Sequence, residues 1–161
     1  MILPENAMVK NFEEVELGGL IVGRFTESGP NFFAIRARQA DMDLFVSLTP
    51  GDDHQPLPYI LDPYSPPKVL DLGTKWEIDV TVDRNFPVFQ IQDRTEVLIR
   101  SKDKYYLRMK EGLFLDLKSG IILGNIERTQ NLCLWKNFSI IMNESIDSKN
   151  TVEVFKYPVS D

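Results

Sequence analysis

The stretch that decides the fold is KDKYYLRMKEGLFLDLKSGIILGNIERTQNLCLWKNFSIIMN, residues 102–143. Turn-forming dipeptides recur in it at intervals of 9, 8, 8 and 9 residues, at Lys102-Asp103, Glu111-Gly112, Ser119-Gly120, Glu127-Arg128 and Lys136-Asn137. The segments between them are rich in aromatic and aliphatic residues and have ordinary strand lengths. Gly112 and Gly120 can adopt the positive φ that tight hairpin turns require. Short strands with regularly spaced turns predict an antiparallel meander.

The segments before residue 102 extend this β pattern less regularly. Residues 75–83, KWEIDVTVD, alternate apolar and polar side chains, which predicts a strand with one buried face. Further strands are expected at 17–25 and 42–48. The run 34–40 fits either a strand or a short helix, and 4–16 fits a short helix because Met8, Val9, Phe12 and Val15 share a helical face.

These patterns together predict a mainly β protein. We expect an antiparallel meander that is either closed as a barrel or folded as a two-layer sandwich, with one or two short helices. A length of 161 residues with 43% hydrophobic residues suits one β-rich domain over 1–161. Strand order and oligomeric state stay open at this point.

Residues 49–73 interrupt the pattern. They hold six of the ten prolines and show no periodicity, so a long proline-rich loop is expected inside the domain. Its aromatic side chains Tyr59 and Tyr64, together with the carboxylates of Asp52 and Asp53, are candidates for contact with a partner.

Charge is unevenly distributed along the chain. Residues 1–73 hold eleven acidic and five basic residues, whereas residues 74–161 hold thirteen of each. The whole net charge of -6 therefore belongs to the first half, which favours a basic partner there or simply serves solubility. Phosphate contacts need clustered Lys and Arg, so an acidic chain is a poor nucleic-acid binder.

One strand does carry clustered bases. If a hairpin turns at 102–103, one face of the next strand presents Lys104, Tyr106, Arg108 and Lys110 to solvent. Pairing with the acidic stripe of residues 76–83 would explain this face, and a protein contact or a single-stranded nucleic acid are the alternatives. We expect a solvated face first, then a protein contact, then nucleic acid.

Catalytic and metal motifs are weak in this sequence. His54 is the only histidine and Cys133 the only cysteine, and neither lies in a nucleophile motif. Residues 52–54, DDH, lack metal-ligand spacing, and no nucleotide-binding glycine motif occurs. We therefore expect no catalytic residue, no metal and no cofactor. Pairs such as Asp41 with Asp43 leave a carboxylate hydrolase as a minor alternative.

The leading functional expectation is a non-catalytic interaction module that binds another protein, such as a small acidic inhibitor or immunity-like protein. The alternative is a β-barrel with a pocket for a small molecule or sugar, with Trp76 or Trp135 at its mouth. A single cysteine, no long apolar run and no leader-like N-terminus predict a cytoplasmic protein that does not span a membrane.

Overall fold

The fold was analysed in a computed structural model that describes residues 4–24, 28–49, 57–61, 68–80, 96–127, 132–145 and 149–158. Strands dominate these residues, and the only helical elements among them are two 3-10 turns, η1 (Phe12–Glu14) and η2 (Lys110–Gly112). Every strand pairing between named strands is antiparallel. The prediction of a mainly β protein with antiparallel sheets is confirmed.

A six-stranded sheet is built from the first half of the chain, in the order β1-β6-β2-β3-β4-β5. Its strands are β1 (Met8–Asn11), β2 (Leu20–Arg24), β3 (Asn31–Gln39), β4 (Met42–Ser47), β5 (Tyr59–Ile60) and β6 (Lys68–Gly73). The central strands of this sheet are buried on both faces. Along β3, for example, Ile35 joins the main core on the inner face while Ala34 joins a second cluster on the outer face. This explains why its strands read as nearly continuous apolar runs.

A five-stranded sheet contains the predicted meander, in the order β11-β10-β9-β8-β12. Its strands are β8 (Leu98–Ser101), β9 (Lys104–Arg108), β10 (Phe114–Asp116), β11 (Ile122–Leu123) and β12 (Leu132–Trp135). Lys102, Gly112 and Gly120 have the positive φ expected at the turns, at 57°, 73° and 71°. The meander ends at β11, because β12 pairs with β8 at the opposite side.

A three-stranded sheet completes the molecule, in the order β14-β13-β7. It consists of β7 (Trp76–Asp79), β13 (Phe138–Asn143) and β14 (Thr151–Tyr157). The alternation predicted for residues 76–80 is confirmed, since Glu77 and Asp79 are exposed and the residues between them are half-buried.

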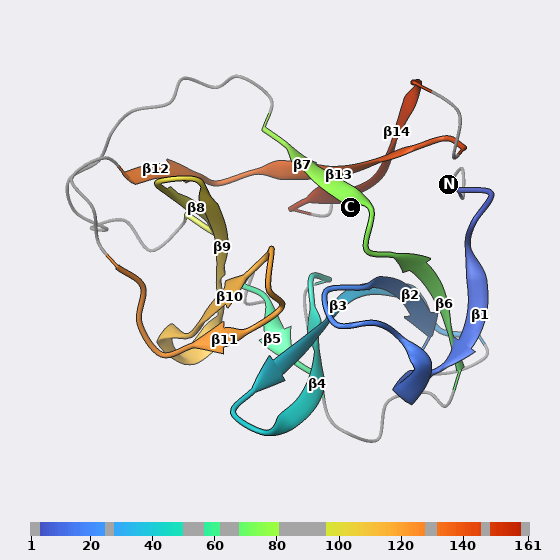
Figure 1. The fold of residues 1–161 in the computed structure, drawn as a ribbon, viewed down its shortest axis with the longest axis horizontal. Coiled ribbons are helices and arrows are strands. Elements are labelled where there is room, and N and C mark those ends of the chain that lie inside the picture. Colours follow the sequence, from blue (N-terminus) through green and yellow to red (C-terminus); the bar gives the residue numbers. More distant parts are fainter. Residues whose placement is uncertain are drawn as a thin grey trace.

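The three sheets surround one main hydrophobic core. Leu20 and Val46 from the six-stranded sheet, Leu98 from the five-stranded sheet, and Phe138 and Ile140 from the three-stranded sheet all belong to it. Figure 1 shows the three-stranded sheet above and the six-stranded sheet below and to the right, with the meander on the left. The described strands do not close into a barrel, because each sheet ends in edge strands.

Two local expectations, for residues 4–16 and 49–73, are corrected, and the open choice between strand and helix for residues 34–40 is decided. Residues 4–16 form β1 and η1 rather than a short helix, because β1 pairs with β6. Residues 34–39 are strand, as part of β3. The predicted loop over 49–73 contains β5 and the long strand β6, which lies between β1 and β2 inside the six-stranded sheet.

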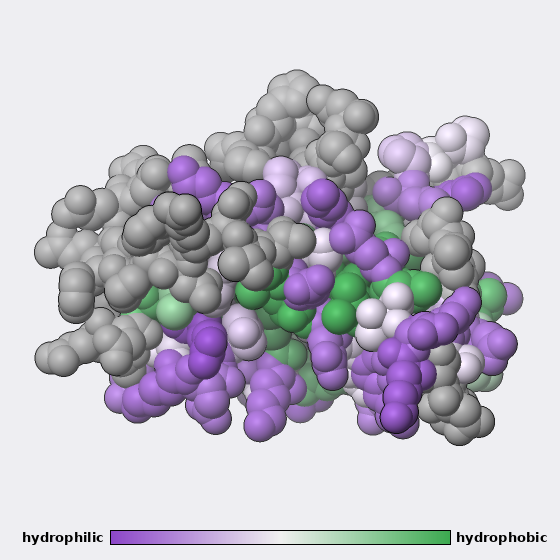
Figure 2. Space-filling view, turned by 90° about the horizontal axis from the view of Figure 1, so that it is seen from above, coloured by the Kyte–Doolittle hydropathy of each residue, from purple (hydrophilic) through white to green (hydrophobic). Residues whose placement is uncertain are grey.

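Seen from above, the residues drawn in colour show hydrophobic side chains gathered in a central band, with hydrophilic side chains on both sides (Figure 2). Among the described residues, no helix has the length and apolar character needed to span a membrane.

Candidate functional site

The first candidate site is the free side of β1. Among the described strands β1 pairs only with β6, so the opposite side of its backbone forms the edge of the six-stranded sheet. Figure 1 shows β1 at the right-hand side of the molecule, next to β6. An edge strand of this kind presents backbone N–H and C=O groups that another strand can bind.

Two large apolar side chains lie exposed on this edge. Met8 is 60% exposed and Val9 is 70% exposed. Val9 lies opposite Leu70 of β6, and directly opposite residues of an antiparallel pair share a face. Leu70 packs against the main core, so Val9 continues the inner face of the sheet into solvent. A strand added beside β1 could bury this side chain.

Acidic side chains flank the two apolar ones. Glu5, Glu13, Glu14 and Glu16 are all exposed, and we call this set, together with Met8 and Val9, the β1 edge surface.

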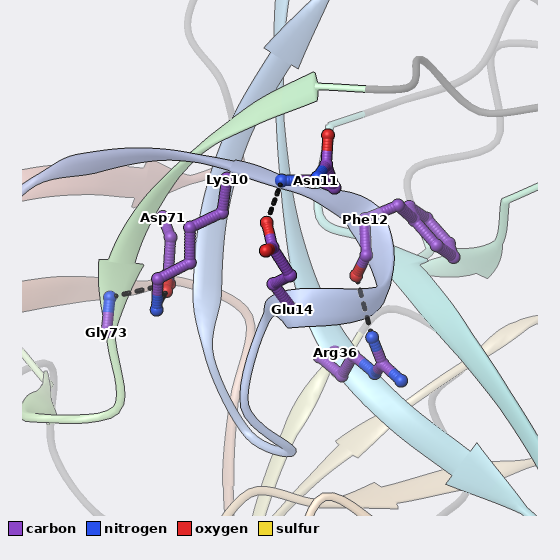
Figure 3. A network of polar contacts seen from close by, with 7 residues as sticks. All are labelled: Lys10, Asn11, Phe12, Glu14, Arg36, Asp71 and Gly73. Carbon is purple, nitrogen blue, oxygen red and sulfur yellow. Dashed lines mark hydrogen bonds and ion pairs between the residues drawn. The ribbon is translucent and has the colours of Figure 1, made fainter.

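The one basic side chain of this segment, Lys10, forms an ion pair within the fold. Lys10 Nζ lies 2.6 Å from Asp71 Oδ2. The hydrogen bond and charge of Asp71 raise the pKa of Lys10, and Glu16 and Glu14 add to the shift. Asp71 is buried, and its other oxygen accepts a hydrogen bond from the backbone N–H of Gly73 (Figure 3). Lysines often protect edge strands from pairing, but this one is directed at the neighbouring strand.

Contacts at the end of β1 hold the edge in place. The backbone N–H of Asn11 donates to Glu14 Oε2 at 2.8 Å, as part of a capping box around η1. The carbonyl of Phe12 accepts a hydrogen bond from Arg36 Nη1 at 2.7 Å (Figure 3). The Phe12 ring packs on Phe45. The chain is therefore fixed where it leaves β1.

Two of the predicted contact residues meet in the structure. Lys110 Nζ lies 5.0 Å from the ring centroid of Tyr59, within cation–π range. The backbone N–H of Lys110 also donates to the carbonyl of Pro58. The proline-rich region and the basic strand thus share one small surface at this point. Asp52, Asp53, Tyr64 and His54 lie outside the described residues.

The rest of the predicted basic face is not a single exposed surface. Lys104 is exposed and its Nζ lies 3.6 Å from Asp116 Oδ2. Arg108 is half-buried. The expectation that Tyr106 faces solvent is wrong, because its side chain is buried at 7% exposure. It joins an outer apolar cluster of the five-stranded sheet with Ile99, Ile126 and Leu132.

The expected pairing of the acidic strand with this basic strand is also wrong. β7 pairs with β13, with Ser139 opposite Asp79. Glu77 and Lys104 nevertheless lie on the wall of one cleft, where β7 approaches the turn between β8 and β9. Residues 81–83 of the acidic stripe are not among those described.

Sequence reasoning missed the β1 edge surface. The sequence predicts Met8 and Val9 on one helical face, because their i, i+1, i+4 spacing with Phe12 fits a helix, yet the segment is a strand. Only the distant pairing with β6 decides between the two. The acidic excess of the first half was the single available signal, and four of its carboxylates flank β1.

Comparisons with known proteins give no further guide. No family model, curated protein or solved structure matches this chain. Among the described residues, no group of three or more His, Cys, Asp or Glu side chains is placed to hold a metal ion.

Proposed function

We propose that this protein is a non-catalytic interaction module that binds a basic protein at the β1 edge surface. The observation that carries the proposal is the exposure of Met8 and Val9, 60% and 70%, on an edge strand flanked by acidic side chains. An open sheet edge with exposed apolar side chains is a template on which a strand of another protein can pair.

Strand addition is the mode of binding that suits this surface. An extended segment of the partner would form main-chain hydrogen bonds with β1, while its alternate side chains would cover Val9 on one face and Met8 on the other. In this proposal the six-stranded sheet is one layer of a sandwich-like fold, and the added strand continues that layer.

Charge supplies the preference for a basic segment. Four exposed carboxylates lie within residues 5–16, before and after β1 in the sequence, while the positive charge of Lys10 is already paired with Asp71. Lys or Arg side chains of a partner would be attracted to this edge, and the attraction would accelerate association and weaken with salt. A small acidic inhibitor or immunity-like protein acting in the cytoplasm is the concrete form of this function.

The test compares two exposed hydrophobic residues. Val9→Lys places a charge on the edge surface, and Met42→Lys places the same charge on another exposed residue, which is 64% exposed on β4. The immobilised wild-type protein should retain a basic protein from native extract, with or without nuclease. Val9→Lys should weaken this binding about tenfold or more, and Met42→Lys should leave it unchanged.

Salt provides a second readout of the same binding. Retention should fall between about 50 and about 500 mM salt, because solvent-exposed charges are screened over this range. Equal retention by the two variants would contradict the proposal. So would binding that survives Val9→Lys but is lost on deletion of residues 52–66, because the proline-rich region would then be the contact. A bound species lost on nuclease treatment would instead indicate a nucleic acid.

A further inference from the structure

A cleft of about 480 Å³ lies where elements of all three sheets meet, away from β1. β7 supplies Trp76 and Glu77, the turn between β8 and β9 supplies Asp103, and β9 supplies Lys104. Gly18 precedes β2 and lines the cleft from the six-stranded sheet. Its volume falls within the range of about 300–1,000 Å³ that is usual for small-molecule sites.

The indole of Trp76 is fixed in the wall of this cleft. Its Nε1–H donates a hydrogen bond to the carbonyl of Gly18 at 3.0 Å. The side chain is half-buried and packs against the main core. Since the polar end of the indole is already bonded, what it offers to a ligand is a rigid apolar surface.

Charged side chains of both signs surround the indole. The carboxylates of Glu77 and Asp103 and the ammonium groups of Lys104 and Lys118 line the cleft, and all four side chains are exposed. Lysine provides only donors and ionised carboxylates only acceptors. A ligand with a net charge would meet as many like charges as opposite ones, whereas a neutral polyhydroxylated ligand can use both kinds of group through its hydroxyls.

We infer that this cleft binds a neutral sugar. The apolar C–H face of the sugar ring lies against Trp76, and its hydroxyl groups donate to Glu77 or Asp103 and accept from Lys104 or Lys118. Binding is the chemistry that the site supports, because both carboxylates are open to water and acid–base catalysis by carboxyl groups relies on desolvation. This inference is independent of the protein contact proposed at β1.

The probe is a panel of neutral mono- and oligosaccharides, compared with glucuronate, inorganic phosphate and zwitterionic amino acids. Binding is followed by tryptophan fluorescence and titration calorimetry. At least one neutral sugar should bind, and Trp76→Ala should weaken it about tenfold or more. Glu77→Gln and Lys118→Ala alter exposed side chains that the core does not use, so they test the cleft should Trp76→Ala impair folding.

A matched control comes from a neighbouring hollow of about 260 Å³, which shares Trp76 and Glu77 with the cleft but is also lined by Lys75, a residue that does not line the cleft. Lys75→Ser should leave sugar affinity within about twofold of wild type, because Lys75 carries the same charge as Lys118 but does not line the cleft. The inference is overturned if no neutral sugar binds at about 10 mM, or if only the charged or zwitterionic compounds bind. Equal loss with Lys75→Ser and Lys118→Ala would likewise overturn it.

Discussion

The six-stranded and the five-stranded sheet each carry an apolar cluster on the outer face, away from the main core, but on the six-stranded sheet a buried charged side chain is added to it. On the six-stranded sheet the buried Arg36 is central: it bonds to the carbonyl of Phe12 and to Asp43, and its guanidinium lies 6.0 and 5.9 Å from the ring centroids of Phe12 and Phe45. On the five-stranded sheet the apolar cluster contains Tyr106. Removing one partner of a buried charge destabilises the fold because the charge is left unpaired. The stability of an apolar cluster depends mainly on how well its side chains fill the available volume.

The largest expected loss of stability comes from the apolar cluster that contains Tyr106. Tyr106→Ala should lower the free energy of unfolding by about 3 kcal/mol, because it removes a buried aromatic ring and leaves a cavity. Tyr106→Phe keeps the ring volume and should change stability by less than about 1 kcal/mol. Urea denaturation measures both. A loss below about 1 kcal/mol for Tyr106→Ala would mean that this cluster is not a genuine core.

Replacing Arg36, on the outer face of the six-stranded sheet, should also lower the free energy of unfolding. Arg36→Met keeps an apolar stem but removes the hydrogen bonds to Phe12 and Asp43, and should cost about 2 kcal/mol. Arg38→Met is the matched control, because Arg38 also bonds to Asp43 but is half exposed, and it should cost less than about 1 kcal/mol. Equal costs would contradict a central role for Arg36. Thermal or urea unfolding provides the comparison.

The smallest effect should depend on pH and should fade in acid. Hydrogen bonds from Arg38 and then Arg36 lower the pKa of Asp43 below its ordinary value of 3.8. A depressed carboxyl pKa stabilises the fold fully above the unfolded-state pKa, and this contribution is lost as pH falls through the lower folded-state pKa. The stability difference between wild type and Asp43→Asn should therefore shrink below pH 3.8.

Urea denaturation across the acidic range follows this difference. Asp41→Asn is the control, since Asp41 is an exposed neighbour without a hydrogen bond among the described residues. The two variants should diverge above pH 3.8, because Asp43→Asn has lost hydrogen-bonded charge interactions with Arg38 and Arg36, whereas Asp41→Asn has lost only a charge interaction with Arg38. A stability difference from wild type that does not depend on pH for Asp43→Asn would show that the carboxylate is not linked to folding.

The meander was predictable because its signals are local. Regular turn dipeptides with Gly112 and Gly120 mark hairpins whose strands pair with their neighbours in sequence. β6 was not predictable, since it follows a proline-rich segment and pairs with strands about fifty residues earlier. The burial of Tyr106 was missed for a similar reason. Alternation shows which residues share a face, but Ile126 and Leu132 arrive on that face from distant segments.

The site was less predictable than the fold. Trp76 was named from sequence as a residue at the mouth of a pocket, and it does line the cleft. The sequence suggested that Glu77 and Lys104 lie on paired strands of one sheet. In the structure they belong to different sheets and line the same cleft. Which charges share a cleft depends on how the sheets pack, and no local pattern in the sequence encodes that packing.

Gly18 links the six-stranded and the three-stranded sheets. Its N–H donates to the carbonyl of Arg36 in β3, and its carbonyl accepts from Trp76 at the start of β7. Nearby, the N–H of Arg38 donates to the carbonyl of Gly120, where β3 bridges to the five-stranded sheet. Hydrogen bonds thus hold the walls of the cleft together in the absence of a ligand. A ligand entering it would find a pre-organised receptor, and little of its binding energy would be spent on restricting backbone motion.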